Sequence, residues 1–298
     1  MEVNDNNAVS DAKGFKRIIR EWFGDVPLIG WLFGILTAVI LEQLIGDPLS
    51  EILYLPKIPV LFGFVIMLKK PLLIPSALAY VMLIYVVPMG VIGRLTAKPF
   101  NGLADKLLRF SLPVSVLIHL ALIYAILHIW ADISAYRVLT LKLTLIAVIL
   151  TLSLNVINGY MGEFSCSHPG FMALGAYGAS VFTVVLFAND KLFGQALLPA
   201  GLGPFLFPVG LIFGGCLAAL GALVIAIPSF RTRGDYLAII SLAFLFIVKS
   251  VIENLELVGG PRGLSSQPNY ASLPTVFIWT VVCVWVINNF VRSTMGKA

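Results

Sequence analysis

The stretch that decides the fold is residues 231–264, RTRGDYLAIISLAFLFIVKSVIENLELVGGPRGL. A basic turn, RTRGD, precedes the apolar run at residues 236–251, and a glycine-rich turn, VGGPRG, follows it. A helix rises about 1.5 Å per residue, so this run and its flanks cover most of the ~30 Å hydrocarbon layer of a bilayer. The stretch therefore predicts one membrane crossing whose two ends differ in chemistry.

The composition extends this interpretation to the whole chain. Hydrophobic residues make up 59% of it and charged residues only 12%, whereas a soluble domain carries roughly 25% charged residues. The net charge of +5 does not indicate nucleic-acid binding, because the basic residues lie in short clusters between apolar runs and none is interleaved with stacking aromatics. We therefore exclude a soluble fold and interpret these charges as determinants of membrane topology.

Eight apolar runs are long enough, or nearly so, to cross a bilayer. They are residues 27–45, 72–92, 110–130, 139–157, 171–188, 203–227, 236–251 and 274–291. A ninth run, residues 52–68, is interrupted by Pro56, Lys57 and Pro59, and a lysine at mid-bilayer costs about 2.5–3.5 kcal/mol. We expect that run to be interfacial or re-entrant. The fold class predicted is all-α, a polytopic transmembrane helix bundle of about eight spans.

The distribution of Lys and Arg predicts the orientation, because segments on the cytoplasmic side carry an excess of both. With the N-terminus inside, the inner segments hold twice as many of them as the outer segments. The inner set includes a basic loop at residues 94–109, and the outer set includes Arg137. Residues 1–26 are then a cytoplasmic tail and residues 27–137 a group of leading spans.

A second unusual passage is residues 158–177, NGYMGEFSCSHPGFMALGAY, which follows one apolar run and opens the next. Non-helical backbone at membrane depth must be enclosed by protein or line a water-filled cavity, since lipid cannot satisfy its N–H and C=O groups. The glycines, Pro169 and the hydroxyls of Ser165 and Ser167 are the residue types that such a break requires. Two interpretations stay open: a broken or re-entrant helix beside a translocation path, and an ordinary tight turn at the cytoplasmic face.

His168 stands alone in this passage. His119 and His128 lie in another span and do not share one helical face, so the histidines do not form a metal site. The three cysteines are far apart and imply neither a disulfide nor a metal framework. For His168 we weigh a structural hydrogen bond to a nearby carbonyl against a role in gating or subunit contact.

Two further spans carry patterns at helical spacing. Gly214, Ala218 and Ala222 fall four residues apart, and such a small-residue face lets another helix approach closely. Lys249 and Glu253 are also four apart, near one end of their span, and we interpret them as an exposed ion pair.

The polar segments between spans supply two groups of contact candidates. The predicted external loop, residues 253–272, contains Gly259, Gly260, Arg262 and Gly263, and is either a contact surface or lid, or a connecting turn. The predicted cytoplasmic face carries Arg231, Arg233, Asp235, Arg292 and Lys297. These residues could contact lipid headgroups, reflect only the excess of Lys and Arg on the cytoplasmic side, or contact a cytoplasmic partner.

Nothing along the chain indicates an enzyme. It contains no GxxxxGK[ST] phosphate loop, no HExxH and no nucleophile with an adjacent base. Glu42 is the main acidic residue inside a span, so a proton-coupled or sodium-coupled carrier has little visible machinery. If transport consumes nucleotide, another subunit must hydrolyse it, and we expect no cofactor and no metal.

The passages NGYMGEFSCSHPGFMALGAYGAS, RTRGDYLAIISLAF and VGGPRGL resemble the M-type permease subunit of bacterial branched-chain amino-acid ABC importers. The resemblance covers roughly residues 139–298. The family pattern reads like GxxSLGHxxFxxxGAY, and the matching residues here are Gly162, Ser165, His168, Phe171, Gly175, Ala176 and Tyr177. Cys166 and Ser167 depart from the usual Leu and Gly. With Asn158, the matching positions other than Ala176 are our candidates for the translocation path.

The resemblance implies a heteromeric importer in the bacterial inner membrane. Its partners would be a second, related permease, two cytoplasmic ATPases, a periplasmic substrate-binding protein and membrane lipids, with no nucleic acid. Leucine, isoleucine and valine are the expected substrates, while similar permeases serve urea, short amides and other amino acids.

The resemblance also predicts that residues 138–298 are a permease core that stops early. Family members continue past a sequence like VRSxxGxA into a coupling helix and further spans, and VRSTMGKA at residues 291–298 begins that pattern. We expect such a chain to dock poorly on an ATPase. Alternatives from other classes are a secondary transporter or channel and a non-transporting membrane scaffold.

Overall fold

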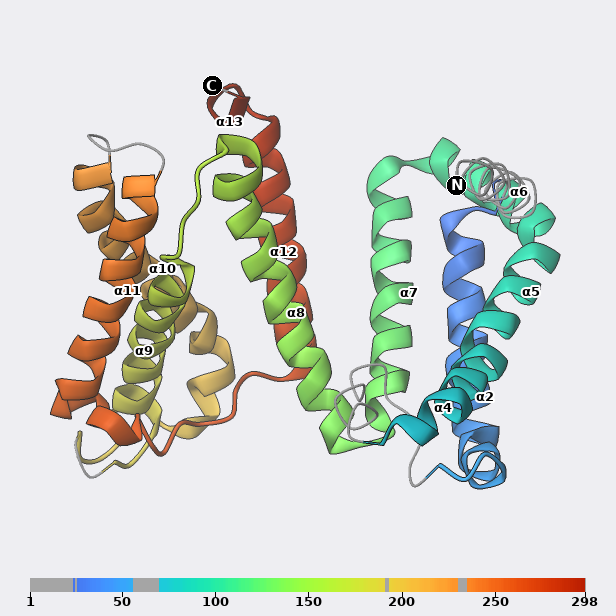
Figure 1. Cartoon of the computed structure of the whole chain (residues 1–298), viewed down its shortest axis with the longest axis horizontal. Coiled ribbons are helices and arrows are strands. Elements are labelled where there is room, and N and C mark those ends of the chain that lie inside the picture. Colours follow the sequence, from blue (N-terminus) through green and yellow to red (C-terminus); the bar gives the residue numbers. More distant parts are fainter. Residues whose placement is uncertain (1–23, 25, 56–69, 191–192, 230–234, 298) are drawn as a thin grey trace, which may run out of the picture. The chain divides into compact units, whose positions relative to one another are not determined.

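The computed structural model describes residues 24, 26–55, 70–190, 193–229 and 235–297 (Figure 1). Among these residues, eight helical segments are long and apolar enough to cross a membrane. They are Leu28–Ile52, Pro71–Leu95, Leu112–Asp132, Ala135–Met161, His168–Phe187, Gly203–Ile227, Tyr236–Asn254 and Leu273–Arg292. The predicted all-α polytopic bundle of eight spans is confirmed. The interfacial or re-entrant interpretation of residues 52–68 falls largely outside the described residues, as does the tail at residues 1–23.

The chain divides into two compact units, residues 1–143 and 144–298, and each is described by itself. In the first unit, α2 (Leu28–Ile52) is the central element and packs against α5 (Val87–Leu95) and α7 (Leu112–Asp132). The span that ends in α5 is one continuous helix with a π-helical turn inside it. Its parts are η1 (Pro71–Leu73), α4 (Ile74–Val81), η2 (Met82–Val86) and α5.

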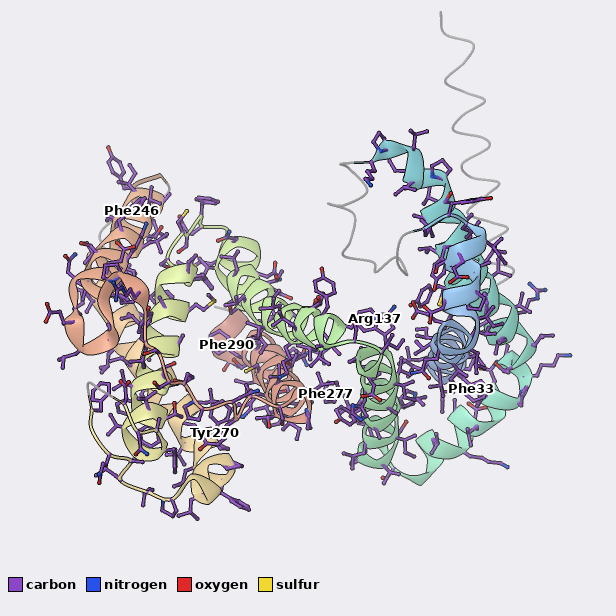
Figure 2. All side chains as sticks on the ribbon, turned by 90° about the horizontal axis from the view of Figure 1, so that it is seen from below. Phe33, Arg137, Phe246, Tyr270, Phe277 and Phe290 are labelled. Atoms are coloured by element: carbon purple, nitrogen blue, oxygen red, sulfur yellow. The ribbon has the colours of Figure 1, made fainter. Side chains whose placement is uncertain are left out.

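Helix α6 (Ala97–Phe110) occupies the segment that the sequence predicted to be a basic loop, and that prediction is wrong. The segment is an amphipathic helix. Its Phe100 ring lies 5.3 Å from the ring of Phe33 on α2, the residue labelled in Figure 2, while Lys98 and Lys106 are exposed. The basic residues misled the prediction because lysine is a good helix former, and a helix with one apolar and one basic face suits a membrane surface.

Among the described residues, the second unit contains the rest of α8 (Ala135–Asn155), four more long helices and several short turns. After α8 come the π-helical turn η3 (Val156–Met161), α9 (His168–Phe187), η4 (Ala200–Leu202), α10 (Gly203–Ser229) and α11 (Asp235–Asn254). Two short turns, η5 (Glu256–Val258) and η6 (Gly260–Arg262), lead to α12 (Leu273–Arg292) and α13 (Thr294–Lys297). The Ser272 side chain caps α12 by accepting from the Thr275 N–H at 3.5 Å.

Helices α9 and α10 form the closest helix pair in this unit. At Gly214 the two backbones come so near that an added Cβ would overlap the carbonyl oxygen of Gly175. Ala218 continues this contact four residues later, 3.7 Å from the position of a Cβ on Gly175. The close approach predicted from the small-residue spacing is therefore present, and helix pairs in membranes commonly use it because lipid provides no hydrophobic drive for association.

Candidate functional site

The helical run of α8 ends within residues 158–177, the passage for which a helix break and a tight turn were both open interpretations. The π-helical turn η3 closes on Gly162, whose backbone is left-handed (φ 73°, ψ 12°), a conformation that glycine adopts without steric cost. Residues 162–167 then run without helical structure until α9 begins (Figure 1). The side-chain oxygen of Asn158 accepts a hydrogen bond from the Ser165 N–H at 3.3 Å and so ties the two sides of the break together.

Serine hydroxyls satisfy the polar groups of this break. Ser165 and Ser167 are both buried, and their hydroxyl oxygens lie 2.8 Å apart. The backbone N–H of Cys166 donates to the hydroxyl of Ser241 on α11 at 2.9 Å, and Ser241 is buried as well. A backbone N–H without a hydrogen-bond partner is costly in an apolar environment. These hydrogen bonds therefore stabilise the non-helical backbone at this position.

The contact with Ser241 also fixes the level at which α9 starts. Ser241 follows the first residue of α11, Asp235, by six positions, which corresponds to roughly 9 Å along a helix. The non-helical segment therefore enters alongside the body of α11 rather than at its end. The sequence did not single out Ser241; its signal was a lone hydroxyl in an otherwise apolar run.

His168 and Phe171 occupy the first turn of α9. The imidazole ring lies 6.1 Å from the Phe171 ring in an edge-on arrangement, and Phe171 lies 5.4 Å from Phe244 on α11. The His168 Nδ1 is buried and has no hydrogen-bond partner among the described residues. The aromatic contacts thus link the first turn of α9 with α11.

A pocket of about 310 Å³ lies farther along α9, between α9, α11 and the turn η6. Tyr177 lines it from α9, Lys249 and Glu253 from α11, and Gly260 from η6. The Lys249 Nζ and the nearer Glu253 carboxylate oxygen are 3.8 Å apart, and both side chains are at least half exposed. The predicted ion pair is therefore present, but it stands on the wall of a cavity.

The predicted external loop folds back on α9. Gly259, Gly260 and Gly263 all have positive φ angles, which the tight turns η5 and η6 require. Gln267 then donates to the buried hydroxyl of Thr183 on α9 at 2.6 Å. Tyr270, labelled in Figure 2 on the segment before α12, packs edge-on to Phe187 with ring centroids 5.8 Å apart. Arg262 is exposed.

The candidates for the cytoplasmic face are placed as far as the structure describes them. Arg231 and Arg233 lie outside the described residues. Asp235 is the first residue of α11, Arg292 is the exposed last residue of α12, and Lys297 ends α13. Their predicted role as a contact surface stays a prediction.

A polar cluster in the first unit was missed. The Arg137 guanidinium donates from Nη1 and Nη2 to the two carboxylate oxygens of Glu42, each at 2.8 Å, and the two side chains are 2% and 0% exposed. The sequence counted Arg137 as a topology charge in an outer loop, and that interpretation is wrong, because the side chain is sealed inside a helix cluster. Figure 2 marks Arg137 near the start of α8.

Aromatic groups complete this cluster. The hydroxyl of Tyr85, within the π-helical turn η2, donates to the Glu42 carboxylate, and the Trp130 indole N–H donates to the Tyr85 oxygen at 3.1 Å. The Arg137 guanidinium also lies 4.9 Å from the Trp130 ring centroid. The signal in the sequence was Glu42 itself, since a carboxylate in an apolar span requires a partner.

The fold and the interrupted helix define a multi-pass α-helical membrane protein. The family described as "Branched-chain amino acid transport system / permease component" matches residues 136–294, more than half of the chain, and the chain belongs to this family. No solved structure matches the chain.

Two curated relatives match part of the chain. Both are described as "High-affinity branched-chain amino acid transport system permease protein LivM", one from Escherichia coli (strain K12) and one from Salmonella typhimurium (strain LT2). They are 38% and 36% identical over 136 residues, which is 45% of this chain and 27% of each relative. The matched region thus spans little more than a quarter of the relatives' length.

Proposed function

We propose that this protein is a permease subunit of an ATP-driven importer and forms part of the translocation path for branched-chain amino acids. The observation that carries the proposal is the non-helical segment at residues 162–167, held beside α11 by the Cys166–Ser241 hydrogen bond. Non-helical backbone inside a bundle of membrane spans is tolerated where it is enclosed or lines a water-filled route. The membership in the permease family supports the same conclusion.

The proposed importer is heteromeric. A second related permease would complete the path, two ATPase subunits on the cytoplasmic side would drive it, and a substrate-binding protein would deliver the amino acid from outside. The chain itself then performs no hydrolysis. We place it in the bacterial inner membrane with its N-terminus inside, which puts residues 259–263 on the outer side.

The test is uptake of radiolabelled leucine. The chain is produced together with the other subunits of its system in a host that lacks its own branched-chain amino-acid importers. We expect leucine uptake that disappears when the ATPase subunits are inactivated by substitution of their phosphate-loop lysines. Unlabelled isoleucine and valine should compete for uptake, whereas urea and short amides should not.

The same experiment separates the importer from the other classes. Flux through proteoliposomes that contain the chain without ATPase subunits would contradict the proposal and indicate a channel or a secondary transporter. Normal uptake by a system in which residues 162–167 are replaced by a run of alanine would contradict a role of this segment in the path.

A further inference from the structure

The lining of the pocket between α9, α11 and η6 combines charged and apolar side chains. Lys249 and Glu253 lie on successive turns of α11. Leu245 and Val248 on the same face of α11 and Ala173 on α9 supply apolar contacts. A mostly apolar lining with a few polar groups is typical of sites for small ligands, whose volumes start at about 300 Å³.

The side chains of Lys249 and Glu253 lie near each other without being hydrogen-bonded. The separation of 3.8 Å between Nζ and the carboxylate oxygen exceeds the ~2.7–2.9 Å of a charge-assisted hydrogen bond. No hydrogen bond between the two groups therefore has to break before a ligand contacts them, and both side chains have flexible stems that can move apart. An exposed pair of this kind contributes little to stability.

A zwitterion of an α-amino acid complements the charges of Lys249 and Glu253. Its carboxylate and its ammonium group are attached to one carbon atom, so a ligand that meets Lys249 with the first group holds the second near Glu253. An aliphatic side chain on the same carbon can then lie against Ala173, Leu245 and Val248 and leave water. A ligand with only one of the two charges would leave either Lys249 or Glu253 unmatched.

Neighbouring residues fix the shape of the pocket. Gly260 and Pro261 of η6 form its edge, and Tyr177 stands beside them, with its hydroxyl 3.5 Å from where a Cβ on Gly263 would lie. The hydrogen bond from Gln267 to Thr183 holds the segment after η6 against α9. The glycine turn is thus part of the pocket wall and not a free loop.

We propose that this pocket binds the substrate itself, as an amino-acid zwitterion with an aliphatic side chain, with Lys249 contacting the carboxylate and Glu253 the ammonium group. The assignment rests on the proposed transport function and adds to it the residues that recognise the backbone charges of the substrate.

Binding of radiolabelled L-leucine to the purified chain in lipid nanodiscs tests this assignment by scintillation proximity. Substitutions Lys249→Gln and Glu253→Gln should each weaken binding by about tenfold or more, because each removes one charge-assisted contact. The exposed charges Lys98 and Glu256, neither of which lines the pocket, supply the matched control variants Lys98→Gln and Glu256→Gln, and these should bind leucine as the unaltered chain does.

Competition by leucine analogues assigns each charge to its partner. Isoamylamine lacks the carboxylate, 4-methylpentanoate lacks the ammonium group, and glycine lacks the side chain. All three should compete worse than leucine on the unaltered chain. In Lys249→Gln, isoamylamine should compete as well as leucine, because the partner of the missing carboxylate has been removed. In Glu253→Gln, 4-methylpentanoate should compete as well as leucine, because the partner of the missing ammonium group has been removed.

Two results would overturn the assignment. One is unchanged leucine binding in both pocket variants, and the other is no binding to the unaltered chain while the complete importer takes up leucine. In either case, leucine uptake by the complete importer would still support the proposed transport function. If the complete importer takes up no amino acid, the proposed transport function is itself contradicted.

Discussion

The two units bring their helices together by opposite means. In residues 1–143, α2, α7 and the beginning of α8 meet around the buried Glu42–Arg137 pair. In residues 144–298, α9 and α10 meet where Gly214 has no side chain, with the backbone of Gly175 against it. Both are ways to hold helices together in lipid, where burial of apolar surface gives no advantage. The contact in the first unit depends on two opposite charges, and the contact in the second unit depends on glycine, which has no side chain.

The difference matches the division of the family resemblance. The family match begins at residue 136, so it covers the unit built by close packing and almost none of the unit built around charge. The packed unit also contains the interrupted helix and the pocket. In that unit the backbone N–H of Cys166 donates to the Ser241 hydroxyl, so a side chain of α11 holds the non-helical segment. The charged cluster stabilises the contact between neighbouring spans.

The largest loss of stability is expected when the Glu42–Arg137 ion pair is broken. Substitution Arg137→Leu leaves the Glu42 carboxylate buried without its partner, which costs about 3–5 kcal/mol of unfolding free energy. The measurement is unfolding in mixed micelles by titration with SDS. The control Glu51→Gln changes an exposed acid on the same helix, α2, and should leave stability within about 0.5 kcal/mol.

A double variant sharpens the same point. Glu42→Leu combined with Arg137→Met removes both charges and should be more stable than Arg137→Leu alone, because no unpaired charge remains. A double variant as unstable as the single one would contradict this explanation and show that the lost contacts of Glu42 and Arg137, and not an unpaired charge, set the cost.

The second effect tests the packed unit with two adjacent glycines. Gly214→Val forces a side chain into the backbone of α9 and should lower the unfolding free energy by about 1–3 kcal/mol. Gly215→Val is the matched control, since open space lies beside Gly215 and the change in helix propensity is the same. The same micelle titration measures both variants. Equal losses at the two positions would contradict the close contact of α9 with α10.

The features that were predictable from sequence are those that a single segment determines. Each span has its own hydropathy, so the spans were predicted. Residues 158–177 have their own glycines, serines and Pro169, so a helix break there was one of the two interpretations that the sequence left open. The ion pair was not, because Glu42 and Arg137 are separated by 95 positions and no local pattern relates them. The partner Ser241 was missed for the same reason. The helix α6 was missed because its charges were read only as topology signals.

The smallest effect is expected at the break itself. Ser241→Ala removes the acceptor of the Cys166 N–H and should lower the unfolding free energy by about 1 kcal/mol, a typical value for one hydrogen bond. The more sensitive measurement is hydrogen exchange, in which a peptide covering residues 162–167 should exchange faster in the variant. Ser250→Ala on the same helix is the control, because Ser250 is exposed and has no contact with the break. If exchange at residues 162–167 is unchanged by Ser241→Ala, the serines at 165 and 167 and the Asn158 side chain hold the break alone, and the packed unit keeps its non-helical segment without help from α11.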